Sequence, residues 1–359
     1  MVSVVVATPA ATGHAGGVTL MVDVAGTGYQ IWFRASGNHR LEPSGDLELA
    51  VGLLVAMATD GILELDRAPS ALLRRRATTI QDVLLSWYPE LRRATLVAPM
   101  DESAPLPSGR GTLACFTGGV DSFYTVLEHA GTLDALLFVH GFDVPLDDQQ
   151  TRTTVSEHLR EAAREIGVGL IEVETNLRDL LDPYADWGQI AHGAALVAVA
   201  SALTREFGRF VVPSSHSYRD LFPWGSHPVL DPLWSTPDLE VEHDGAGATR
   251  VDKIEAIAPA PAVRKHLRVC WQQGGGYNCG SCEKCLRTMV TLDLLGELTA
   301  SETFPHDVDL ERVSALPLRN ESDASYLREN IELARRVGSA RYMAVLEKAH
   351  RNYLAREEA

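Results

Sequence analysis

The sequence predicts an α/β protein, with a Rossmann-like parallel sheet and helices on both of its faces. Short apolar runs alternate with helical stretches between residues 113 and 213, and strands separated by helices form right-handed βαβ units. A glycine turn directly follows the first of these runs, at the end of a strand where such sheets bind ligands. The chain has 359 residues, of which 45% are hydrophobic and 22% charged, so it is long enough for more than one core.

The first 105 residues are expected to form a small α+β domain, in which no residue pattern indicates a reaction. Two runs alternate in polarity like strands around a turn at Gly26 and Gly28, and a helix is expected after Ser44. The expected strands are 18–24, 29–35 and 62–65, and the expected helices are 47–57 and 79–91. Prolines, glycines and small polar residues at 101–110 predict a linker.

Residues 106–295 are expected to contain the parallel sheet, and residues 296–359 a helical extension. The expected strands of the sheet are 113–116, 135–140, 170–174 and 210–213, with helices at 155–166, 191–207 and 286–295. The extension is expected to contain helices at 322–337 and 340–354. Loops that follow the strands lie at the edge of the sheet where ligands bind, so we expect functional side chains there.

The turn between the first strand and first helix of this sheet predicts a phosphate site. Gly118 and Gly119 permit a positive φ and a close approach of the backbone, and Thr117 and Ser122 add hydroxyl groups. Unpaired N–H groups at a helix N-terminus attract anions. The carboxylate of Asp121 in the same loop suits a magnesium ion that bridges it to the phosphates. The alternative is a strand–turn–helix that binds no ligand.

Four of the five cysteines lie close together and predict a metal site. Cys270, Cys279, Cys282 and Cys285 are spaced as the thiolate ligands of a tetrahedral structural zinc ion are, and the glycines 274–276 let the chain turn back toward Cys270. An iron–sulfur cluster and four reduced core cysteines are the alternatives. The odd number and tight grouping of the cysteines argue against a secreted disulfide framework.

The segment Thr117-Gly118-Gly119-Val120-Asp121-Ser122 resembles the PP-loop of N-type ATP pyrophosphatases. The resemblance implies a HUP-type sheet and cleavage of ATP between its α and β phosphates. Such enzymes attach AMP to a substrate oxygen, and the loop holds the pyrophosphate that is released. The cofactors implied are therefore ATP and Mg²⁺.

Together, the PP-loop and the cysteine motif at 270–287 resemble 7-cyano-7-deazaguanine synthase over residues 110–295. That family converts a deazapurine carboxylic acid to a nitrile through an acyl-adenylate and an amide, with ammonia as the nitrogen source and a structural zinc ion near the substrate. The loop after the second strand departs from the family, because it reads His140-Gly141-Phe142 where a Tyr-Gly-Gln segment is typical. Relatives in bacterial antiviral operons suggest a protein partner as another acceptor.

The resemblance gives each candidate site residue a role. The expected catalytic residues are Asp121, Ser122 and Lys253. The expected ATP and pyrophosphate contacts are Thr117, Gly118, Gly119, Val120, Asp121, Ser122 and His140. The expected substrate contacts are His216, Tyr218, Arg219, Trp224 and Trp234, and the metal ligands are Cys270, Cys279, Cys282 and Cys285.

Composition excludes several other classes of protein. A formal net charge of −16 argues against binding nucleic acid, including a tRNA substrate. The sequence has no membrane span and no leader pattern, so we expect a cytoplasmic protein, with a homodimer as its assembly. Val2 stands where glutamine-hydrolysing relatives have a nucleophilic cysteine, which favours free ammonia or an amine. A sulfur transferase and a non-catalytic nucleotide-binding scaffold are the alternative functions.

Overall fold

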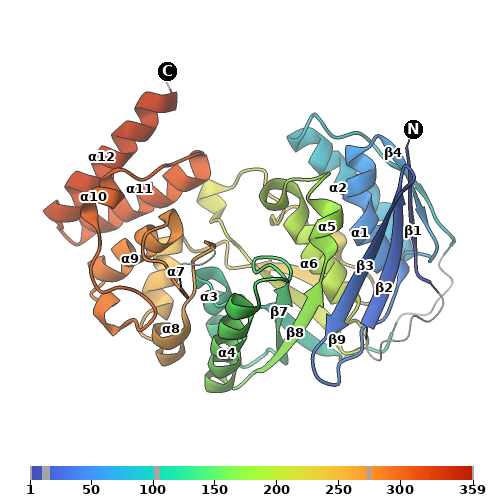
Figure 1. Ribbon diagram of the computed structural model, residues 1–359, viewed down its shortest axis with the longest axis horizontal. Coiled ribbons are helices and arrows are strands. Elements are labelled where there is room, and N and C mark those ends of the chain that lie inside the picture. Colours follow the sequence, from blue (N-terminus) through green and yellow to red (C-terminus); the bar gives the residue numbers. More distant parts are fainter. Residues whose placement is uncertain (1, 10–16, 101–105, 273–275, 358–359) are drawn as a thin grey trace.

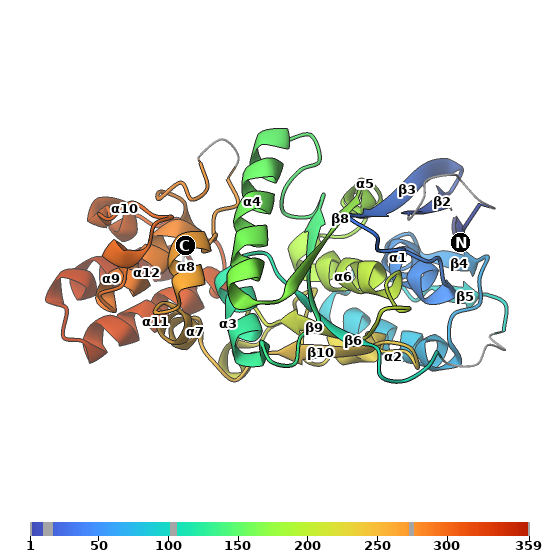
Figure 2. The same cartoon turned by 90° about the horizontal axis from the view of Figure 1, so that it is seen from below.

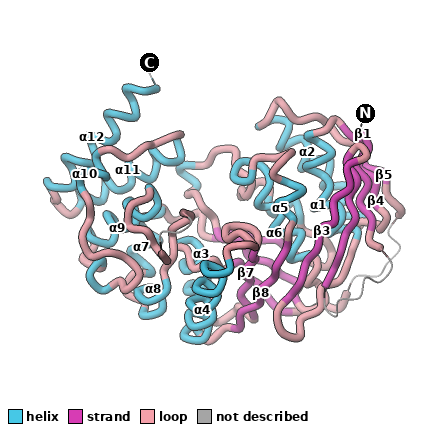
Figure 3. Tube along the Cα trace, in the orientation of Figure 1, coloured by secondary structure: helices cyan, strands magenta, loops and turns pink. Residues whose placement is uncertain are grey.

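The computed structural model describes residues 2–9, 17–100, 106–272 and 276–357. The described strands form one sheet, in the order β10-β9-β6-β7-β8-β3-β2-β1-β4-β5. Figure 3 shows the strands in the centre and right of the molecule, with only helices and loops at the left. The strands are β1 Val2–Ala7, β2 Gly17–Val24, β3 Thr27–Ala35, β4 Gly61–Leu65, β5 Thr95–Val97, β6 Gly111–Cys115, β7 Ala135–His140, β8 Gly169–Thr175, β9 Phe207–Pro213 and β10 Glu240–Asp244.

Helices lie on both faces of the sheet, which confirms the predicted α/β class (Figure 1). The helices are α1 Gly45–Ala58, α2 Ala71–Trp87, α3 Val120–His129, α4 Gln149–Ile166, α5 Leu177–Leu181, α6 His192–Ser201, α7 Arg250–Ile257, α8 Pro261–His266, α9 Glu283–Leu294, α10 Leu310–Ser314, α11 Glu321–Arg336 and α12 Ala340–Glu357. None of these described helices combines the length and the hydrophobicity that crossing a membrane requires.

Side chains of the central strands point alternately to the two faces of the sheet, and each face carries its own hydrophobic core. In β6, Leu113 and Cys115 point to the core beneath α1 and α6, whereas Ala114 points to the core beneath α3 and α4. Successive side chains of a strand point to opposite faces, so a strand buried on both faces is apolar throughout. All six residues of β7 are buried, and the first five are apolar; His140, the last, is the exception.

The five strands from β6 to β10 are parallel to one another. The chain adds them first on one side of β6 and then on the other side. The chain runs outward from β6 to β7 and β8, then returns to add β9 and β10 on the other side of β6. The loops that follow β6 and β9 therefore meet at a topological switch point. Open α/β sheets bind their ligands at such a point, outside the carboxyl ends of the strands.

The first hundred residues extend this sheet. β3 pairs antiparallel with β8, with Phe33 opposite Thr175, and α1 packs against α6. Side chains from both segments belong to one hydrophobic core that runs from Val4 to Val241. The sequence predicted a small domain of its own over residues 1–105, whereas these strands share both sheet and core with the segment that follows.

Most predicted elements are present, but several differ from the prediction. The helix predicted over 191–207 is shorter, because a π-helical turn (Trp187–Ala191) precedes α6 and turns separate α6 from β9. The helix predicted over 79–91 is α2, which begins at Ala71 and ends at Trp87. β1, β5 and β10 were not predicted. β10, with the sequence Glu-Val-Glu-His-Asp, buries only Val241 fully, so its composition gives little sign of a strand. Half of the predicted linker, residues 101–105, lies outside the described residues.

The C-terminal helices form a layer at the opposite end of the molecule from β1–β5 (Figure 2). α11 packs on α9 and α7. α10 packs on α12 and α9, and α12 also packs on α11. Leu327, Ile331 and Leu346 from this layer belong to the same core as α3 and α4. The predicted helical extension is thus joined to the face of the sheet that carries the glycine turn.

We expect the N-terminal strands and the central sheet to unfold together, because they share one core. Replacing the fully buried Phe33 with alanine should destabilise the whole chain by about 3–5 kcal/mol. Urea unfolding followed by both tryptophan fluorescence and circular dichroism measures this. Met21→Ala, at a half-exposed position on β2, is the control. Two separate transitions, with only one shifted by Phe33→Ala, would contradict the shared core.

Candidate functional site

The glycine turn after β6 leaves the N-terminus of α3 open. Gly118 has φ = +71°, a conformation that favours glycine, and a Cβ there would also lie 2.9 Å from Cδ2 of Leu159, which would have to move. Gly119 is the N-cap residue of α3, and no side chain caps the helix. No side chain therefore occupies the first N–H groups of α3, which are the groups that bind anions at a helix N-terminus.

The two hydroxyl groups of the turn hold its shape. Ser122 Oγ donates to the carbonyl oxygen of Gly119 at 3.1 Å and accepts from the backbone N–H of Thr117 at 3.3 Å. Ser122 is buried, while Thr117 is exposed. Val120, expected to contact ATP, is buried in the core, so only its backbone is available for such a contact.

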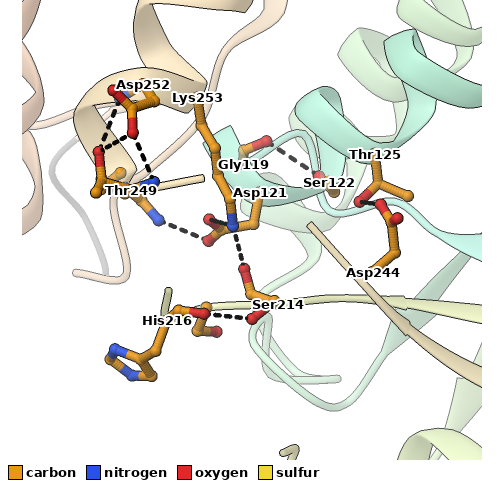
Figure 4. Close-up of polar contacts among 12 residues, drawn as sticks. Gly119, Asp121, Ser122, Thr125, Ser214, His216, Asp244, Thr249, Asp252 and Lys253 are labelled. Carbon is orange, nitrogen blue, oxygen red and sulfur yellow. Dashed lines mark hydrogen bonds and ion pairs between the residues drawn. The ribbon is translucent and has the colours of Figure 1, made fainter. Parts of the chain in front are cut away.

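Asp121 contacts two cationic side chains of α7, of which Lys253 is labelled in Figure 4. Nη1 of Arg250 is 2.6 Å from Oδ2 of Asp121, and Nζ of Lys253 is 3.1 Å from Oδ1. Nζ of Lys253 also donates to the carbonyl oxygen of Ser214, which follows β9, at 2.5 Å. Lys253 therefore connects the two loops that meet at the switch point.

The cluster of Asp121, Arg250 and Lys253 carries one excess positive charge and is largely hidden from water. The side chain of Lys253 is only 2% exposed and that of Arg250 10%. Burial alone would raise the pKa of Asp121, but attraction to Arg250 and Lys253 outweighs burial and holds this pKa below its usual value. A buried excess cation next to an open helix N-terminus suits an anionic ligand.

The loop after β9 brings a histidine into this region. Ser214 Oγ donates to the carbonyl oxygen of His216, whose ring is buried between Phe222, Trp224 and Tyr326. Burial lowers the pKa of His216 to about 3, and nearby cations add to the effect of burial although Asp121 opposes it. His216 is therefore neutral at physiological pH.

Two residues of α11 reach the same site. Tyr326 donates its hydroxyl proton to the carbonyl oxygen of Ser215 at 2.8 Å, and its ring lies under the guanidinium group of Arg287 at 3.9 Å. A carboxylate oxygen of Glu329 accepts from the backbone N–H of Val251 at 3.1 Å and so caps the first turn of α7. The C-terminal layer thus supports the helix that carries Arg250 and Lys253.

The other side chains expected to contact ATP or the substrate do not all lie at the glycine turn. His140 ends β7, but its ring nitrogens contact Glu172, Ser156 and Arg152, not the glycine turn. Trp224 contacts the ring of His216, so these two expected substrate contacts lie in one aromatic cluster. Trp234 does not join this cluster, because its ring is 1% exposed and packs in the core beneath α1 and α6.

Tyr218 and Arg219 lie at the surface of the short turn that follows His216. Tyr218 is 63% exposed, and Arg219 forms ion pairs with Asp220 and with Glu332 of α11. A half-exposed ion pair contributes little to stability. These two side chains are therefore accessible, but the predicted substrate contacts do not form one compact group.

The cysteine cluster can hold a metal ion such as zinc. The Sγ atoms of Cys270, Cys279, Cys282 and Cys285 all lie within 4.8 Å of one another. Backbone N–H groups of Ser281 and Cys282 point to Sγ of Cys279, a pattern that stabilises thiolates. Two of the glycines predicted to turn the chain, 274 and 275, lie outside the described residues.

Neighbouring side chains fix the cysteine loop to the rest of the protein. Oδ1 of Asn278 accepts from the backbone N–H groups of Val269 and Cys270, while Nδ2 donates to the carbonyl oxygen of Leu267. Such contacts hold metal ligands in place before the metal binds. Cys115 lies in β6, outside the cluster, and burial raises its thiol pKa.

Sequence reasoning missed Arg250, Tyr326 and Glu329, whereas Ser214 directly follows a predicted strand, in a loop where functional side chains were expected. Arg250 had a detectable signal, because Thr249 and Asp252 form a capping box that marks the start of α7. From that start, Arg250 and Lys253 are three residues apart and share one helix face. Tyr326 and Glu329 are brought to the site by the long-range packing of α11, which no local pattern reports.

Comparison with known proteins adds no further constraint. No family model matches the chain, and neither a curated protein nor a solved structure matches it.

We expect one thiolate ligand to be essential for metal binding and for stability. Cys282→Ser should abolish stoichiometric zinc binding. It should also lower the free energy of unfolding by more than about 4 kcal/mol, because the free energy of metal binding contributes to folding. Elemental analysis and thermal unfolding measure both effects. Cys115→Ala is the control and should keep one metal ion per chain. Equal metal content in the two variants would disprove the site.

We expect the protein to lose stability as pH rises, because of the raised pKa of Glu329. Burial raises its pKa from 4.5 to about 7, so between these values the folded state keeps a proton that the unfolded state releases. Between pH 4 and pH 8, the free energy of unfolding of the wild type should therefore fall by up to about 3 kcal/mol relative to that of Glu329→Gln. Urea unfolding across this range tests it, with the exposed Glu332→Gln as control. Parallel pH profiles for all three proteins would contradict the expectation.

Proposed function

We propose that the protein is an AMP-forming ligase with a PP-loop and a HUP-type sheet, which adenylates a substrate carboxylate with ATP. The observation that carries the proposal is the position of Lys253, which bonds both Asp121 after β6 and Ser214 after β9 at the switch point. It places a buried cation beside the open N-terminus of α3, within the motif that resembles a pyrophosphate-binding loop.

In this reaction the substrate carboxylate oxygen attacks the α phosphorus of ATP, and the bond to the β phosphate breaks. The N–H groups at the start of α3 bind the departing pyrophosphate, and Arg250 and Lys253 offset its growing negative charge. Asp121 is the residue that would hold Mg²⁺, which neutralises phosphate charge when bound. In the described arrangement both of its oxygens contact cationic side chains, so metal binding requires those contacts to be shared or exchanged.

The second half of the proposed reaction transfers the acyl group. Ammonia or an amine attacks the carbonyl carbon of the acyl-adenylate, and AMP leaves with the bonding electrons while an amide forms. A second activation, at the amide oxygen, followed by loss of AMP and protons, gives the nitrile of the resembled synthase. The aromatic rings of His216, Phe222 and Trp224 support a planar acid, for which a 7-deazapurine acid is our candidate, and an amine of a protein partner is a further possible acceptor.

For the cysteine cluster we propose a structural zinc ion. Zn–S bonds of about 2.3 Å in a tetrahedron place the sulfur atoms roughly 3.8 Å apart. Sγ of Cys270 lies 3.9 Å from that of Cys282, and the same distance separates Cys279 from Cys285. A four-iron cluster binds each thiolate through a different iron atom and holds the sulfur atoms farther apart. Thiolation chemistry through such a cluster is therefore disfavoured.

The products of ATP cleavage test the proposal. With Mg²⁺-ATP, ammonia and 7-carboxy-7-deazaguanine, the wild type should release AMP and pyrophosphate. Asp121→Asn and Ser122→Ala should each lower the rate by about 100-fold or more, because the first removes the group that would hold Mg²⁺ and the second removes the hydroxyl group that holds the turn in shape. Asp82→Asn, an exposed carboxylate on α2, is the matched control. Release of ADP and phosphate would reject the mechanism, and ATP binding without turnover on a panel of acids would favour a nucleotide-binding scaffold.

A further inference from the structure

Tyr326 is held firmly although it comes from the C-terminal layer, outside the segments that carry the PP-loop and the cysteines. Its ring stacks on the imidazole ring of His216, with centroids 5.5 Å apart and planes at 24°. The guanidinium group of Arg287 lies 3.9 Å from the ring centroid. Only 7% of Tyr326 is exposed, so contacts with the protein surround both its ring and its hydroxyl group.

The hydroxyl group of Tyr326 lies close to two possible partners. It is 2.8 Å from the carbonyl oxygen of Ser215 and 3.2 Å from Nδ1 of His216. A carbonyl oxygen can only accept, so the single hydroxyl proton is donated to Ser215. The phenol oxygen is then an acceptor toward Nδ1, which must itself carry the ring proton.

A neutral imidazole with its proton on Nδ1 has a free lone pair on Nε2. Burial keeps His216 neutral, as do Arg250, Lys253 and Arg287, while Asp121 is the opposing charge. Burial also raises the pKa of Tyr326, so its hydroxyl group keeps its proton. Among the described residues, no hydrogen-bond partner contacts Nε2 of His216. The ring points away from the Asp121–Lys253 pair (Figure 4).

We propose that Tyr326 is a positioning residue that fixes His216 in its Nδ1–H form and leaves Nε2 to accept a hydrogen bond from the acid substrate. The ligand therefore belongs to the planar carboxylic acids that carry an N–H donor. This identification of the ligand rests on the proposed function, whereas the tautomer is a property of the free protein. The weakly basic Nε2 accepts a hydrogen bond without taking up the proton.

Nitrogen NMR of the full-length chain, labelled with ¹⁵N-histidine, tests the tautomer without any substrate. His216→Gln identifies the signal. In the wild type, Nδ1 of His216 should carry the proton, and the ring should stay neutral down to about pH 5. Tyr326→Phe should shift the signals toward the other tautomer. Tyr342→Phe removes a buried hydroxyl group of α12 that bonds to Asp293, and it should leave them unchanged. A wild-type ring protonated on Nε2, or identical spectra for wild type and Tyr326→Phe, overturns the proposal.

Steady-state pyrophosphate release with 7-carboxy-7-deazaguanine tests the role toward the substrate. Tyr326→Phe should raise KM for the acid about tenfold, as expected for one weakened hydrogen bond, with KM for ATP unchanged. A general loss of structure would change both constants and would lower the melting temperature beyond that of Tyr342→Phe. Unchanged KM for the acid overturns the contact at Nε2. A wild type that releases no pyrophosphate rejects the proposed function and this ligand with it, while the NMR result on Tyr326 stands independently.

Discussion

The arrangement of the site depends on how the charge of a buried lysine is balanced. Lys253 is almost completely hidden from water, and a buried ammonium group without partners would be very costly. Asp121 and the carbonyl oxygen of Ser214 supply those partners from two different loops. The requirement to satisfy one charge therefore fixes α3, α7 and the end of β9 relative to one another.

The sequence predicted the parts of the fold that depend on local pattern. Apolar runs and turns predicted β2, β3, β6, β7, β8 and β9, and the cysteine spacing predicted a cluster that the structure assembles. β10 was missed because its polar residues outnumber its buried ones. The pairing of β3 with β8 was also missed, since residues 33 and 175 are linked by packing and not by any repeat or motif.

The candidate site was predictable where a motif carries its chemistry and unpredictable where distant segments meet. Asp121 and Ser122 follow two glycines, so their position after a strand was evident. Tyr326 is more than 200 residues away in sequence, and only the packing of α11 on α9 and α7 brings it to Ser215. Trp234 shows the reverse error, because an aromatic residue in an irregular segment was assigned to a ligand although it fills the core.

The extended sheet has two edge strands, β5 and β10, and neither favours the addition of a further strand. β5 has three residues, and β10 is rich in acids, with Glu242 paired to Arg209. Short or charged margins prevent strands of another molecule from adding to a sheet. Any assembly of this chain with itself or with a partner is therefore expected to form through its helical surfaces and loops.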